Sequence, residues 1–191
     1  MIYVRYDVYK HARNAAWNCL IKYKINSLPV RLKTITDHLG ILVVSNSSAA
    51  VLAPSDRGRT IKIGTQWYIV VDEYDRPDTR RFTIAHELGH IILGHAMEKG
   101  FARSYHFIYK PETETEADVF AARLLCPSVV LRALNIRSPE EIMTACHVSY
   151  SCAVNRAQRM EELYRRDKFL VSPLEREVLK NFQEFIERHR E

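Results

Sequence analysis

The residues best able to do chemistry in this chain lie together in the stretch Thr83 to Gly94. His86, Glu87 and His90 follow one another there in the order H-E-x-x-H, the pattern of zinc hydrolases. On a helix, side chains four residues apart lie one turn above each other, so the two histidines can share one metal ion. Glu87 lies about 100° around the helix from His86, where it flanks the metal and can take a proton from metal-bound water. The spacing therefore predicts metal-assisted hydrolysis.

The motif lies in an apolar run that predicts a helix buried on most sides. The apolar residues of this run are Phe82, Ile84, Ala85, Leu88, Ile91, Ile92 and Leu93. Two imidazoles and a carboxylate are costly to bury without a partner. Core histidines satisfied by ordinary hydrogen bonds are the alternative, and the ligand geometry favours the metal.

A catalytic zinc takes three protein ligands and a water, so a further ligand must come from elsewhere in the chain. The pattern H-E-x-x-H-x-x-G-x-x-H would place a third histidine on the same stretch. It fails here, because the chain has Leu93 and Ala96 where that pattern has glycine and histidine. His95 would lie about 180° around the helix from His86, and we interpret it as a residue at the helix end.

Carboxylates open the next helical pattern, Pro111 to Cys126. Glu114 shares a helix face with small and apolar residues that can approach another helix, so it is the preferred third ligand. Glu116 shares its face with Arg123, which we expect in solvent, so Glu116 is the reserve ligand. Asp118, one turn after Glu114, suits a supporting role in which it accepts the free N–H of a ligating histidine. The alternative is an acidic helix N-terminus that complements its own dipole.

The stretch from Met97 to Lys110 shows no regular period. Tyr105, His106 and Tyr109 fall there, near the expected mouth of the site. A phenol or imidazole at that place can stabilise the oxyanion of a tetrahedral intermediate. Simple packing of loop aromatics is the alternative.

The order of expected elements predicts an α+β fold with a small twisted sheet. We expect helices over 7–26, 27–39 and 78–94, with strands at 41–44, 50–52, 60–63 and 67–71. Asp78 is the expected N-cap of the helix that carries the motif, and Pro29 is expected near the start of the second helix. The sheet edge beside the motif helix is a candidate surface for adding an extended peptide, and a covered edge is the alternative.

Helices are expected throughout the C-terminal part of the chain. Ser138 and Ser172 open capping boxes, and the hairpin over 138–166 resembles a helix-turn-helix. Its second helix carries Arg156, Arg159, Arg165 and Arg166. We favour a solvated basic face over DNA binding, because Glu161 and Glu162 interrupt the charge. The amphipathic helix after Ser172 must pack back on the domain or against a partner.

Charge, cysteine content and the lack of long apolar runs indicate the compartment of the protein. The 191 residues carry a net charge of +5, which permits an acidic partner without requiring one. The four cysteines form no C-x-x-C pair, so we expect reduced thiols. The N-terminus is charged where a signal peptide is apolar, and no run is long enough to span a membrane. These features predict a cytoplasmic protein.

Two stretches together resemble the ImmA/IrrE family of metallo-endopeptidases: FTIAHELGHIILGH at 82–95 and ETEADVFAARLLCP at 114–127. The resemblance covers about residues 10–165. It implies a zincin-like metallopeptidase domain over 1–136, followed by a helical extension over 137–191. It also implies a gluzincin-like site with one Zn²⁺ per chain, in which His86, His90 and Glu114 are ligands and Glu87 is the catalytic base. Asp118 stands where many relatives carry asparagine, and either side chain can accept a hydrogen bond.

The resemblance further implies the substrate, a helix-turn-helix repressor encoded nearby, whose cleavage switches on phage, mobile-element or stress genes. Two imidazoles and a carboxylate suit zinc best, with manganese or cobalt as the alternatives. The competing function is a regulator that binds DNA or a repressor partner without cutting it, with a structural metal or none.

Overall fold

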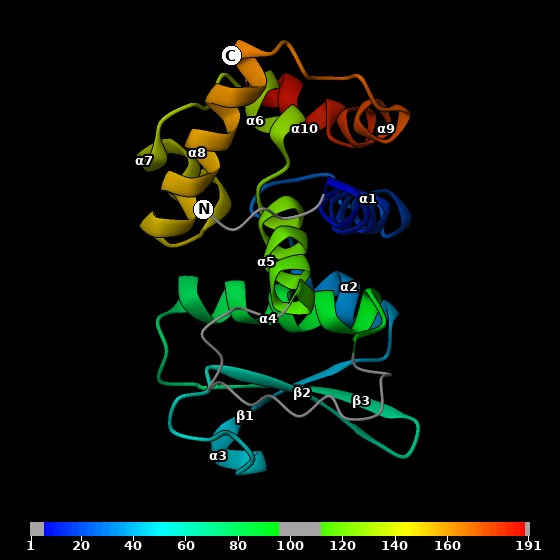
Figure 1. The fold of residues 1–191 in the computed structure, drawn as a ribbon, viewed down its shortest axis with the longest axis vertical. Coiled ribbons are helices and arrows are strands. Elements are labelled where there is room, and N and C mark those ends of the chain that lie inside the picture. The colour runs from blue at the N-terminus through cyan, green and yellow to red at the C-terminus, as the bar shows by residue number, and fades with distance from the viewer. Residues whose placement is uncertain (1–5, 96–111, 190–191) are drawn as a thin grey trace.

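The computed structural model describes residues 6–95 and 112–189 (Figure 1). The fold is α+β, as the sequence predicts, with a three-stranded sheet at one end of the molecule. The strands are β1 (Leu42–Ser45), β2 (Gly58–Ile63) and β3 (Gln66–Val71). β3 is central, parallel to β1 and antiparallel to β2. Among the residues that the structure describes, β1 and β2 are therefore the edge strands of this sheet.

Helices make up the rest of the described chain. Their bounds are α1 Tyr6–Lys22, α2 Leu32–His38, α3 Asn46–Ala49, α4 Pro77–Ile92, α5 Glu112–Leu125, α6 Ser128–Ala133, α7 Pro139–Cys146, α8 Tyr150–Arg165, α9 Pro173–Asn181 and α10 Gln183–Arg188. In Figure 1, α4 lies above the sheet, and α5 runs from α4 towards the C-terminal helices at the opposite end. The α4–α5 crossing thus lies between the sheet and the helical end of the molecule.

β3 and α4 match the strongest patterns in the sequence. β-Branched residues predict β3, and Ile69, Val70 and Val71 are buried in its C-terminal half. α4 carries the H-E-x-x-H motif, as expected, and starts with Pro77 in its first turn. The expected cap is wrong, because Arg76 occupies the N-cap position and Asp78 lies inside the first turn. There the carboxylate complements the helix dipole instead.

The strand expected over 50–52 is absent from the described structure, where the short helix α3 ends instead. Ala50 has a left-handed conformation with φ of +52°, which a strand does not allow. The side-chain Oδ1 of Asn46 accepts hydrogen bonds from the backbone N–H groups of Val51 (3.1 Å) and Leu52 (3.0 Å). Those donors would otherwise form the strand ladder, so the local hydrogen bonds of one asparagine replace the sheet.

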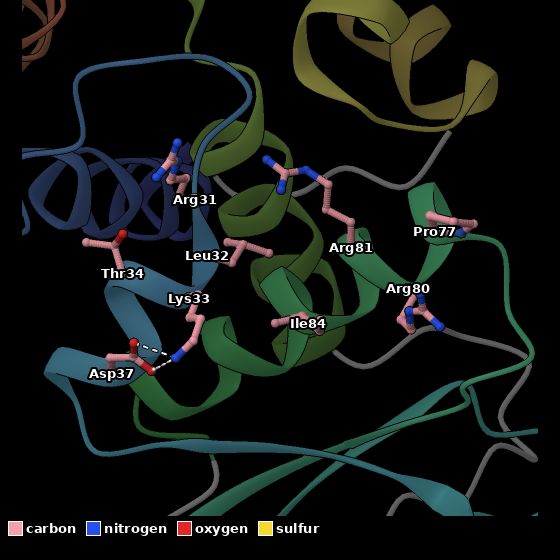
Figure 2. Close-up of a pocket in the computed structure, with 9 residues that line it drawn as sticks. All are labelled: Arg31, Leu32, Lys33, Thr34, Asp37, Pro77, Arg80, Arg81 and Ile84. Carbon is pink, nitrogen blue, oxygen red and sulfur yellow. Dashed lines mark hydrogen bonds and ion pairs between the residues drawn. The ribbon is translucent and has the colours of Figure 1, made fainter.

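α2 begins at Leu32, five residues later than the sequence predicts. Arg31 before it is extended, and the carbonyl of Val30 accepts a hydrogen bond from the guanidinium of Arg81 in α4. Figure 2 shows Arg81 and Ile84 of α4 in the hollow beside the start of α2. The hydrogen bond from Arg81 thus engages the Val30 carbonyl, which lies before α2, and connects this segment to α4.

One cluster of buried apolar residues joins the N-terminal helix to the C-terminal ones. The apolar face expected after Ser172 packs back on the protein, since Val178, Phe182 and Ile186 are buried. Ser138 caps α7 through a capping box with Glu141, as predicted. The four cysteines are free thiols, also as predicted. Within the described ranges, no helix has the length and apolar character that crossing a membrane requires.

Candidate metal centre

The helices α4 and α5 approach each other closely at the glycine of the motif. A Cβ added to Gly89 would lie 3.0 Å from Cδ1 of Phe120 and 3.3 Å from Cα of Ala117. These separations are tighter than ordinary van der Waals contact, so a larger residue would push α5 away. Because α5 packs here, its first turns lie beside the two histidines of α4.

Three side chains converge at this crossing. The Nε2 atoms of His86 and His90 are 3.0 Å apart. Oε2 of Glu114 lies 3.2 Å from Nε2 of His86, and its Oε1 lies 3.3 Å from Nε2 of His90. Donors bonded at 2.0–2.1 Å to a tetrahedral zinc are roughly 3.3–3.4 Å apart. The three donor atoms, which lie within 4.8 Å of one another, could therefore hold one metal ion.

Two of the three residues, His90 and Glu114, have the protonation states that metal binding requires, and His86 does not. Burial lowers the pKa of His90, which keeps the imidazole neutral. Burial opposes ionisation of Glu114, but its hydrogen bonds to the two histidines outweigh this and lower its pKa. For His86, burial is outweighed by hydrogen bonds to Asp118 and Glu114, which raise the pKa to about 9. A metal ion at this site must therefore displace a proton from His86 at neutral pH.

Asp118 bonds to His86 and supports its orientation. Its Oδ1 lies 2.8 Å from Nδ1 of His86, one helical turn beyond Glu114 on α5. A carboxylate at that atom favours the tautomer in which Nδ1 carries the proton and Nε2 keeps its lone pair. The lone pair is then directed at the other two donors.

Glu87 lies between α4 and the sheet edge, with a side chain that is 1% exposed. The hydroxyl of Thr60, on β2, lies 2.9 Å from Oε2 of Glu87 and 3.2 Å from its backbone oxygen. β2 can approach α4 because Gly58 has no side chain: a Cβ there would meet Cγ2 of Thr83 at 2.3 Å. Sequence reasoning missed Thr60 and Gly58, since no motif connects a strand residue with a helix 27 positions later.

The geometry agrees with a comparison with known families. The model of the IrrE N-terminal-like domain, a peptidase M78 domain, matches residues 36–158, more than half of the chain. The chain belongs to this family. Its function is therefore of the metallopeptidase type, and the family resemblance noted in the sequence is confirmed. Comparison with curated proteins returned no match.

A second chain of hydrogen bonds supports His90 in this IrrE-like domain. Gly94 has a positive φ of +83°, which turns His95 back towards α4. Nδ1 of His95 lies 3.1 Å from Nδ1 of His90, and Nε2 of His95 lies 2.9 Å from Oε2 of Glu116. When Glu116 accepts from His95, the other ring nitrogen of His95 is free to accept the Nδ1–H of His90. Nε2 of His90 then keeps its lone pair for a metal.

His95 and Glu116, which support His90, have roles other than those expected from the sequence. His95 lies beyond the helix end, as the sequence indicates, but the turn at Gly94 makes it a partner of His90. Glu116 bonds to His95 and lies outside the group of three donors. The turn could have been suspected from Gly94, which is a common residue just after a helix.

The expectation that Arg123 faces solvent is wrong. Its side chain is buried, with only 8% exposed, and its Nε donates to Oη of Tyr9 at 3.0 Å. The partner lies 114 positions earlier in the chain, so sequence spacing gave no sign of it. Arg156 is buried as well, which contradicts the solvated position expected for it, whereas Arg165 and Arg166 are exposed as expected. The oxyanion candidates Tyr105, His106 and Tyr109 lie outside the described residues.

Proposed function

We propose that this protein is a zinc-dependent endopeptidase of the cytoplasm that cleaves a helix-turn-helix repressor and so derepresses phage, mobile-element or stress genes. The observation that carries the proposal is the convergence of His86, His90 and Glu114, with Glu87 next to His86 in the same helix. The four free thiols support a reducing compartment. The repressor substrate follows from the family resemblance of the two motifs.

The donor set fits zinc, because two imidazoles and one carboxylate leave a tetrahedral position open. His86, His90 and Glu114 would hold the ion. When bound, zinc supplies Lewis acidity that polarises the scissile carbonyl and makes water more acidic. Glu87 accepts the proton of the attacking water and returns it to the leaving amine. Thr60 keeps the Glu87 carboxylate in one orientation for both transfers.

The edge strand β2 is the surface that fits an extended substrate. Within residues 6–95 and 112–189, only β3 pairs with β2, so its other edge offers backbone donors and acceptors. A peptide that adds to this edge gains ladder hydrogen bonds without regard to its side chains. Because Thr60 on the same strand contacts Glu87, such a peptide passes beside the catalytic base.

The test is Glu87→Gln, assayed on the helix-turn-helix repressor encoded nearby. We expect wild type to bind one zinc and cut the repressor, and the variant to bind one zinc but cut about 10²–10⁴ times more slowly, because the base is lost. Elemental analysis gives the metal content and mass spectrometry gives the fragments. Glu161→Gln, which changes an exposed carboxylate on α8, is the matched control and should cut normally.

Cleavage that persists in Glu87→Gln would refute the proposed mechanism. The competing function, a regulator that binds a repressor or DNA without cutting, makes a different prediction. Wild type and Glu87→Gln would then capture the repressor equally, with no fragments from either. Salt-dependent binding to arbitrary duplex would identify DNA as the partner.

A further inference from the structure

A pocket between α1, α5, α8 and α9 is lined largely by cationic side chains. Its volume is about 210 Å³, roughly seven times the ~30 Å³ share of one water in the liquid. None of the metal-binding residues lines it. Its charged lining residues are one acid, Glu175, and six cations: Arg13, Arg123, Arg156, Arg159, Arg166 and Lys168.

Arg156 is the most unusual of these cations. Its side chain is 2% exposed, and none of its three guanidinium nitrogens has a hydrogen-bond partner among the described residues. Burial and the nearby charge of Arg123 lower its pKa to about 10, so it is still protonated at neutral pH. A buried charge without a partner is strongly unfavourable. The pocket therefore contains a buried cation that has no hydrogen-bonded counterion among the described residues, and Glu175 attracts it only through space.

Two other lining residues also have a buried donor atom without a partner in the described chain, although the terminal guanidinium nitrogen Nη1 of Arg159 pairs with Glu162. Nε1 of Trp17 and Nε of Arg159 are also buried without a partner among the described residues. The carboxylate of Glu175 accepts the backbone N–H of Ser172 at 3.4 Å and forms no ion pair with a described arginine. Several buried donors without partners thus line the same pocket, while Glu175, the only acid in its lining, caps α9.

The field in the pocket is positive enough to affect a neighbouring phenol. Burial alone would raise the pKa of Tyr9, but the charges of Arg123 and Arg159 outweigh it, and the pKa is lowered. Both guanidinium groups lie 5.2 Å from the centre of the Tyr9 ring. A group that is neutral in water is thereby pulled towards its anionic form.

The basic hollow beside α2 in Figure 2 provides a contrast. There Lys33 pairs with Asp37 at 2.7 Å, and Arg80 donates to the backbone oxygen of Glu73 at 2.8 Å. Arg81 donates to the carbonyls of Val30 and Cys146. Those three cations already have partners. The pocket around Arg156 is therefore distinguished by its unpaired buried donors and not by its basic lining alone.

We propose that this pocket binds the phosphate or diphosphate group of a small molecule, either the free inorganic anion or the end of a nucleotide. Guanidinium groups bind phosphate oxygens through paired, charge-assisted hydrogen bonds. The volume admits one or two phosphate groups and excludes several residues of a polymer. The proposal is independent of the peptidase function, because the pocket and the metal centre share no residue.

Trp17 provides a direct readout. The chain has two tryptophans, so Trp67→Phe leaves Trp17 as the only indole in the full-length protein. We expect phosphate, diphosphate or ADP to change its fluorescence saturably, with one site per chain, at an ionic strength fixed with potassium chloride. The melting temperature should rise by several degrees at saturation, because the ligand binds only the folded state. ADP alone would indicate a nucleotide, and equal binding of diphosphate would indicate the inorganic anion.

Substitution of the cations tests the site itself. Arg156→Met should weaken binding at least tenfold, yet raise the ligand-free melting temperature, because it removes an unpaired buried charge. If Arg156 were merely structural, its substitution would lower the ligand-free melting temperature and leave anion binding unchanged. Arg159→Gln, at a partly exposed position, should also weaken binding and protects the test against a misfolded Arg156→Met. Arg165→Gln, exposed on the same helix and outside the lining, is the control.

The proposal fails if none of the three anions binds saturably to wild type. It also fails if Arg156→Met and Arg159→Gln bind as tightly as wild type. Equal weakening by Arg165→Gln would show a general surface charge effect and overturn the site. Binding of duplex DNA but not of diphosphate would do the same.

Discussion

His90 is the residue most completely fixed by its surroundings. Its side chain is fully buried, with Glu114 and His86 at Nε2 and His95 at Nδ1. Glu116 completes the line at the far nitrogen of His95. A ligand whose remote nitrogen already has a partner loses little freedom when a metal binds. The Glu116–His95 pair is thus a support for His90.

Glu114→Ala and Glu116→Ala should differ in their affinity for zinc. Glu114→Ala removes a donor, so stoichiometric zinc should be lost. Glu116→Ala removes only the support of His95, so zinc should remain but bind about 10–100 times more weakly. Glu116→Gln should restore part of the loss, because its amide oxygen can still accept from His95. Competition with a chromophoric chelator measures all three affinities.

Equal loss of zinc from Glu114→Ala and Glu116→Ala would contradict this assignment and make Glu116 a ligand. Glu161→Ala, on the exposed side of α8, should bind zinc as wild type does.

The residues that sequence alone could place are those connected by helical spacing. His86 and His90 are neighbours because they are four apart, and Asp118 follows Glu114 for the same reason. The support from His95 was missed because it depends on the positive φ of Gly94, a backbone angle that spacing does not encode. Tertiary partners as distant as Tyr9 and Arg123 leave no pattern in one sequence.

At the scale of elements, the separation of α4 and α5 sets the geometry of the centre. We expect Gly89→Ala to weaken zinc binding at least tenfold and to lower stability by about 1–3 kcal/mol, the usual cost of overpacking. The cause is the new Cβ, which meets Phe120 and the backbone of Ala117. Chemical denaturation and zinc competition measure the two effects.

Phe120→Leu tests whether crowding is the cause. The added methyl of Gly89→Ala should fit better against the smaller side chain, so the double variant should lose less stability than the two single losses combined. Strict additivity would indicate that Gly89 acts through something other than the contact with Phe120.

Element types were predicted where the local pattern was strong, as for β3 and α4. The errors at Ala50 and at the start of α2 share one cause. In each, a polar group from outside the segment binds its backbone: Asn46 for one and Arg81 for the other. Such bonds override the weak propensity of a short segment. The edges of elements therefore depend on contacts that only the folded chain reveals.

At the scale of the whole molecule, the metal is expected to add stability without being needed for folding. The buried cluster extends from α1 to α10 and does not depend on the three donors. Removing zinc should lower the melting temperature by roughly 8–16 °C, given about 4 kcal/mol of linkage at a thousandfold excess over Kd and about 2–4 °C per kcal/mol. Circular dichroism should still show a helical, cooperatively melting protein.

Unfolding at room temperature after chelation would refute this expectation and make the metal structural. Restoring zinc, but not magnesium, should return the original melting temperature, since magnesium prefers oxygen ligands.

If the proposed cleavage takes place beside β2, the contact between Thr60 and Glu87 would also limit which targets can be cut. A segment that pairs with β2 must first give up the hydrogen bonds of its own fold, because strand pairing uses the same backbone groups. Compact helices of a target would then resist, and linkers or transiently opened segments would be cut. The opening equilibrium of the target would set its lifetime. A signal that loosens the target would then trigger its destruction while the enzyme stays unchanged.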